Sequence, residues 1–133
     1  MIEVEVFGAS LAPEAPSQQE ICRLCEGVAA SMGVHDAHVA IEFVDGARIE
    51  ELNAEYRERQ MPTDVLSFPI DGVEPLASEQ LPRELGDVVI CPQHTVDLRE
   101  AIVHGMLHLL GMDHETDDGE MLALQDELLT GAD

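Results

Sequence analysis

The sequence predicts a single small α+β domain, and three observations lead to that prediction. The chain has 133 residues, the size of one folding unit whose core needs no disulfides. Four short segments have the patterns of β-strands, and four longer segments repeat apolar residues at helical spacing. We find no internal repeat and no composition change that would divide residues 1–133 into two domains.

The first half of the chain alternates between the two kinds of element. Residues 2–7 alternate apolar and acidic side chains, which indicates a strand with one buried face. After a loop with two prolines, residues 17–33 repeat apolar side chains at spacings of three and four and start with a Ser-x-x-Glu capping box, so we predict a helix. Residues 39–43 alternate again as a strand, and residues 49–56 form a short helix.

The second half begins with strands and ends with helices. Residues 64–68 and 87–91 are compact apolar runs typical of buried strands, and the acidic, proline-bearing segment 72–82 between them is a predicted loop. Residues 98–110 place an apolar face on a helix that the following glycine can end, since glycine adopts the left-handed conformation at little cost. A last helix is predicted over residues 117–128.

The composition indicates an acidic protein of a reducing compartment. Against 28 acidic residues stand six arginines and no lysine, which gives a formal net charge of −22. An odd number of cysteines and no secretory leader predict a cytoplasmic location. No apolar run approaches the ~20 residues of a membrane-spanning helix, so we expect no membrane partner. Nucleic acid would be repelled at long range, so an RNA substrate has to be delivered by a partner or held locally at a few arginines.

Three histidines, His104, His108 and His114, form the most informative pattern. Residues four apart on a helix lie about 40° apart around its axis and about 6 Å along it, so His104 and His108 can point at one ion. Gly111 lets the chain turn, so His114 can return as a third ligand. Three nitrogen ligands leave the fourth tetrahedral position for water, as in catalytic zinc sites. We therefore predict one Zn2+ per chain.

The other histidines and the paired cysteines do not show this pattern. His35, His38 and His94 lack ligand spacing, and an ordinary surface or core role is the better interpretation. Cys22 and Cys25 have the spacing of a metal or redox pair, but both fall on or near the apolar face of the predicted helix. Buried thiols are the simpler interpretation.

The same histidine spacing occurs in the metzincin proteases. Those enzymes need a glutamate directly after the first histidine, because its carboxylate takes a proton from water at the zinc. Gly105 occupies that position here and cannot transfer protons. A metzincin-like protease is therefore a disfavoured alternative.

Residues 104–114, His-Gly-Met-Leu-His-Leu-Leu-Gly-Met-Asp-His, resemble the metal site of the bacterial YbeY endoribonuclease family. Three further segments resemble the family in the same order: Leu52-Asn53 with Tyr56-Arg57, residues 63–69 and residues 85–90. The resemblance extends from about Val39 to the C-terminus. It implies that residues 1–133 are one YbeY-like metal-dependent hydrolase domain, with a small mixed β-sheet of about four strands flanked by helices and a zincin-like metal helix.

The resemblance also implies a function. The implied activity is that of a zinc-dependent, single-strand-specific endoribonuclease in small-subunit ribosomal RNA maturation and ribosome quality control. The ribosomal small subunit or an assembly GTPase is the implied partner. The three histidines are the implied ligands, and Arg57 is the implied catalytic arginine, since a guanidinium can clamp a phosphate or offset developing charge. Without the resemblance, an ion pair with a neighbouring glutamate would be the simpler role for Arg57.

Several points stay open at this level. Asp113 and Glu115 flank the third ligand, and each can accept a proton, orient a histidine or be a plain helix-end carboxylate. A non-catalytic ribosome assembly factor, in which zinc mainly stabilises the fold, is a third candidate. Leu66 and Phe68 share one face of their strand, and a core role is the better interpretation for both. Ser67 shares the other face with Val65, and its role is open. The segment between Cys91 and His104 is shorter than expected for the family.

Overall fold

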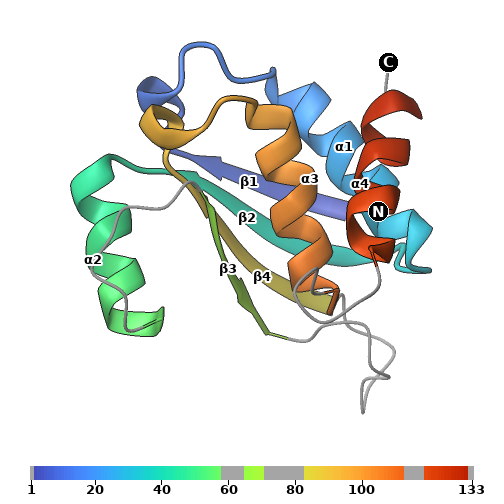
Figure 1. Cartoon of the computed structure of the whole chain (residues 1–133). Helices are drawn as coiled ribbons and strands as arrows, with labels where there is room; N and C mark the ends of the chain where they lie inside the picture. Colours follow the sequence, from blue (N-terminus) through green and yellow to red (C-terminus); the bar gives the residue numbers. More distant parts are fainter. Residues whose placement is uncertain (1, 58–64, 71–82, 113–118, 132–133) are drawn as a thin grey trace.

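The computed structural model describes residues 2–57, 65–70, 83–112 and 119–131, without the side chains of Tyr56 and Arg57. It confirms the α+β class, with a four-stranded mixed sheet flanked by helices (Figure 1). In the described parts, no helix is both long and apolar enough to cross a bilayer. The elements are β1 (Ile2–Phe7), η1 (Ala9–Leu11), α1 (Gln18–Ser31), β2 (Ala37–Phe43), α2 (Gly46–Arg57), β3 (Val65–Pro69), β4 (Arg83–Ile90), η2 (Pro92–His94), α3 (Leu98–Leu109) and α4 (Glu120–Gly131).

The strands lie in the order β1-β2-β4-β3, and only the edge strand β3 runs antiparallel to its neighbour. β4 starts at Arg83, four residues before the predicted run 87–91. The alternation that marks a strand is interrupted at Gly86, whose φ of 125° suits glycine. A side chain there would collide with the carbonyl oxygen of Phe68 on β3, so the glycine allows the two strands to pair.

The sheet is covered on both faces. α1, α3 and α4 pack on one face and form the main core, to which β4 contributes Val88 and Ile90. α2 covers the other face, where Val89 and Leu66 pack in a smaller cluster. Figure 1 shows α2 on its own, apart from the three other helices. The predicted core role of Leu66 is thereby confirmed.

Side chains at the helix ends explain where the helices start and stop. The Glu20 amide donates to Ser17 Oγ (3.2 Å), so the serine half of the predicted capping box is confirmed, while the Glu20 carboxylate pairs with Arg99. α2 starts three residues earlier than the predicted helix 49–56, because the Arg48 amide donates to Asp45 Oδ1 (2.8 Å) and this cap precedes the first apolar residue. α3 ends as predicted, with Gly111 in the left-handed region at φ 97°.

His38 joins three neighbouring strands. Its Nδ1 lies 2.7 Å from Glu84 Oε2 on β4, and its Nε2 lies 3.0 Å from Glu5 Oε1 on β1. Partial burial lowers the pKa of His38, but the hydrogen bonds and charges of the two glutamates outweigh burial and raise the pKa above its ordinary 6.5. His38 thus has a carboxylate partner on each neighbouring strand, in agreement with the structural role that we expected for it.

We expect His38 to make stability depend on pH. Because its pKa is raised in the folded chain, its contribution is complete below about pH 6.5 and is lost as the pH rises through the folded-state pKa. Urea unfolding of the wild type and of His38→Gln should differ most near about pH 6, by about 1 kcal/mol or less for a partly exposed pair, and least near about pH 9. A difference that stays constant over this range would show that the carboxylates do not raise the pKa.

Candidate metal centre

α3 presents His104 and His108 one helical turn apart on a partly exposed side of the helix. Their Nε2 atoms are 3.2 Å apart, and their rings meet edge to face with centroids 4.7 Å apart. Two nitrogen ligands at ~2.0–2.1 Å from a tetrahedral zinc are separated by roughly 3.3–3.4 Å. The separation of the two Nε2 atoms is therefore close to that of two nitrogen ligands of one zinc ion.

The proton positions on this pair follow from a third side chain, Gln125 of α4. His104 Nδ1 lies 2.8 Å from Gln125 Oε1. A carbonyl oxygen only accepts, so Nδ1–H of His104 donates and Nε2 of the neutral ring keeps its lone pair. In the metal-free chain, Nε2–H of His108 then donates to Nε2 of His104. An imidazole with a bare Nε2 is the form that binds a metal ion.

Gly105, between the two histidines, is buried against the sheet. An added Cβ would overlap one methyl of Val88 and lie 3.1 Å from the other. Val88 is fully buried and stiff at χ1, so it cannot move aside cheaply. A glutamate, as metzincins require, does not fit at this position. The packing thus adds a steric reason to the chemical one for disfavouring that class.

Ser67 fixes the strand that borders the centre. Its Oγ–H donates to the backbone oxygen of Gly105 at 3.0 Å, which links β3 to α3. This oxygen belongs to the turn that carries both histidines, so the bond resists a shift of α3 along the sheet. Ser67, whose role was open from the sequence, has a positioning contact.

A pocket of about 280 Å³ opens beside His104. Its walls come from the start of β3, from the segment that joins β4 to α3, and from the first turns of α3. The polar side chains of its wall, besides His104, are those of His94, Thr95, Asp97 and Glu100. The pocket gives a substrate group access to one imidazole of the pair.

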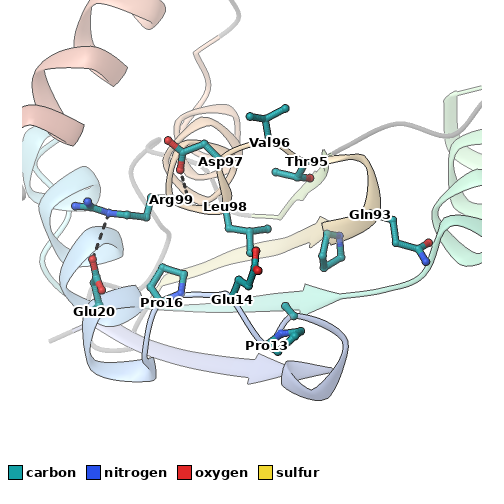
Figure 2. Close-up of a pocket in the computed structure, with 12 residues that line it drawn as sticks. Pro13, Glu14, Pro16, Glu20, Gln93, Thr95, Val96, Asp97, Leu98 and Arg99 are labelled. Atoms are coloured by element: carbon teal, nitrogen blue, oxygen red, sulfur yellow. Dashed lines mark hydrogen bonds and ion pairs between the residues drawn. The ribbon is translucent and has the colours of Figure 1, made fainter.

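The Thr95–Asp97 segment also lines a larger pocket of about 700 Å³ (Figure 2). Its opposite wall is the proline-bearing segment before α1. Figure 2 also shows Asp97 at the start of α3 and the ion pair between Arg99 and Glu20 (3.2 Å). Asp97 Oδ1 accepts from the Arg99 and Glu100 amides, a cap that the sequence patterns did not reveal.

The remaining predicted site residues fall largely outside the described part of the chain. His114, Asp113 and Glu115 lie in the segment 113–118, and Arg57 is the last residue of α2, with its side chain outside the described set. Among the described residues alone, no group of three His, Cys, Asp or Glu is arranged to hold a metal. The third ligand thus stays a prediction.

The two cysteines of α1 lie in or near the core. Cys25 is fully buried and Cys22 partly buried, and both are free thiols. Burial, reinforced by the neighbouring Cys22 and Glu26, raises the pKa of the Cys25 thiol far above its ordinary range. A thiol held neutral is a poor ligand and a poor nucleophile, so the interpretation of buried thiols is confirmed for Cys25.

Sequence patterns missed Gln125, although a signal was present. Gln125 follows Met121 by one helical turn, which puts a polar side chain on the apolar face of the last predicted helix. A polar residue at such a position needs a partner in the core. What the sequence could not give was the identity of that partner.

Comparison with known proteins places these features in a family. Residues 10–133 match the family model of the endoribonuclease YbeY. The endoribonuclease YbeY of Leifsonia xyli is 40% identical over an alignment of 148 positions, which covers 98% of this chain and 94% of that protein. The endoribonuclease YbeY of Micrococcus luteus is 39% identical over 130 residues, with 85% and 82% coverage. The solution structure of TM1509 from Thermotoga maritima superposes with a TM-score of 0.54 at 26% identity and covers 97% of this chain.

Gly105→Ala tests the close approach of α3 to the sheet. The substitution should lower the free energy of unfolding by about 1–3 kcal/mol, because the new methyl group overpacks against Val88. Gly27→Ala is the matched control: Gly27 is an exposed position inside α1 with nothing within 4 Å of an added Cβ, and it should gain about 0.5–1 kcal/mol. Denaturant unfolding measures both. Equal gains in the two variants would contradict the packing argument.

Proposed function

The chain belongs to the YbeY endoribonuclease family, and on that premise we propose that it cleaves single-stranded RNA with one zinc ion held by His104, His108 and His114. We further propose that its substrate is small-subunit ribosomal RNA, in maturation and in ribosome quality control. The observation that carries the metal proposal is the 3.2 Å separation of the His104 and His108 Nε2 atoms. Any two side chains four residues apart on a helix lie near each other. The separation of these two Nε2 atoms in addition matches the distance between two nitrogen ligands of one zinc ion.

The chemistry divides between the ion and the protein. When bound, zinc would activate water and polarise a phosphate oxygen. The two imidazoles of α3 hold their side of the site, and the bond between Ser67 and the Gly105 backbone keeps α3 in place on the sheet. The pocket beside His104 admits part of the substrate. Arg57, as the catalytic arginine, would offset charge on the phosphate.

The charge distribution indicates that a partner supplies much of the affinity for RNA. Asp97 and Glu100 line the pocket and repel a phosphate backbone. Arg48 and Arg99 are ion-paired with Glu51 and Glu20, which reduces what they offer to RNA. We therefore propose that the ribosomal small subunit, or a GTPase that acts on it, presents the RNA.

A non-catalytic assembly factor with a structural zinc is the alternative. Structural zinc sites are closed by four protein ligands, whereas catalytic sites keep an open position. His104 lines an open pocket, which supports the catalytic proposal. The location that we propose, the cytoplasm, suits either role.

RNA cleavage tests the proposal directly. The zinc-loaded chain should cut ribosomal RNA, and chelation or His108→Ala should reduce the rate at least ~100-fold, because two of three nitrogens cannot hold the ion in place. His35→Ala, which removes an exposed histidine outside the site, should leave the rate unchanged. An unfolded polypeptide should not be cut. One zinc bound per chain without any RNA cleavage would favour the assembly-factor alternative.

Arg57→Ala tests the proposed phosphate contact. Loss of a guanidinium that stabilises the transition state should reduce cleavage about 10²–10³-fold without changing zinc content. Arg48→Ala is the control, since Arg48 lies on the same helix and pairs with Glu51 at the surface. Unchanged cleavage in Arg57→Ala, with zinc retained, would remove Arg57 from the mechanism.

A further inference from the structure

Gln125 is a buried polar residue in apolar surroundings. Only 5% of its surface is exposed. Asn53 is the one other buried polar residue in the described ranges. It lies on α4 one turn after Met121, which is fully buried against the main core. Burying an amide is unfavourable unless its groups are hydrogen-bonded, so the position calls for a specific partner. That partner is Nδ1 of His104, at 2.8 Å.

The direction of this bond decides which form of His104 faces the ion site. A neutral imidazole carries its proton on either nitrogen, and a ring protonated on Nε2 cannot bind a metal there. Gln125 Oε1 accepts from Nδ1–H and so excludes the wrong tautomer. The same bond also fixes the rotation of the ring, because Nδ1 has to keep facing α4.

We propose that Gln125 is a positioning residue that holds His104 in its Nδ1–H tautomer and in the orientation that points Nε2 at the metal. Gln125 acts through His104 and touches neither RNA nor the ion. The part of this inference that concerns zinc binding rests on the proposed function. Its structural content, the tautomer of His104, exists in the metal-free chain and can be measured there.

The contact couples two elements that are distant in sequence. α4 begins after the segment 113–118, so the chain passes the predicted third ligand before it returns to His104. Partners that fix the outer nitrogen of a histidine ligand typically contribute 10–100-fold in metal affinity. A purely structural hydrogen bond would instead affect folding stability and leave zinc affinity of the folded chain unchanged.

Three variants of the full-length chain separate these roles. Gln125→Met has a similar length and no acceptor, Gln125→Glu keeps an acceptor at the same place, and Met121→Leu perturbs the packing of α4 one turn away. Imidazole nitrogen NMR of the metal-free chains at about pH 9, where histidine is neutral, reports the tautomer of His104. Competition with a chelator reports the zinc dissociation constant.

We expect the wild type, Gln125→Glu and Met121→Leu to show His104 protonated on Nδ1. Gln125→Met should gain the Nε2–H form and bind zinc about 10–100-fold more weakly, and Gln125→Glu should restore the affinity. Unchanged tautomer and affinity in a folded Gln125→Met would overturn the proposal. If that variant does not fold, the wild-type spectrum decides: His104 protonated on Nε2 overturns it, and on Nδ1 supports it. A wild type with the expected tautomer that binds no zinc would refute the metal function and not the contact.

Discussion

α3 lies so close to the sheet at Gly105 that no side chain fits between its backbone and Val88. The other features of the site depend on this contact. It brings the turn with both histidines next to β4 and lets Ser67 of the edge strand bond the Gly105 backbone. His104 and His108 differ by only about 40° around the helix axis. While the Gly105 side of α3 packs on the sheet, both histidines therefore lie together on a partly exposed side.

The contact also restricts the chemistry available to the protein. In a metzincin, the residue after the first histidine has to reach water at the zinc, which requires that side of the helix to be free. Here the same side is in the core. A proton acceptor for RNA cleavage therefore has to come from another position in the chain. The segment 113–118 carries Asp113 and Glu115, and the pocket wall carries Asp97 and Glu100.

The short connection between β4 and α3, residues 91–97, shapes the approach to the site. Thr95 Oγ1 donates to the Cys91 backbone oxygen at 2.7 Å, and Gln93 Oε1 accepts from the Gly46 amide at the start of α2. The first bond closes a turn within the connection, and the second ties the connection to the helix on the opposite face. The connection, which includes η2, can therefore serve as the common wall of both pockets.

The sequence by itself determined the fold class, the approximate extent of most elements and the placement of His104 and His108 one turn apart on α3. Those features depend on local periodicity and on short-range capping, which neighbouring residues control. Residue spacing also predicted the turn at Gly111, which the structure has, and His114 as a third ligand, and the resemblance implied Arg57. Only the tertiary structure assigned a partner to Gln125, a contact for Ser67 and a steric reason for Gly105. Each of these depends on residues at least 17 positions apart in the chain that packing brings together, and no local pattern encodes which ones will meet.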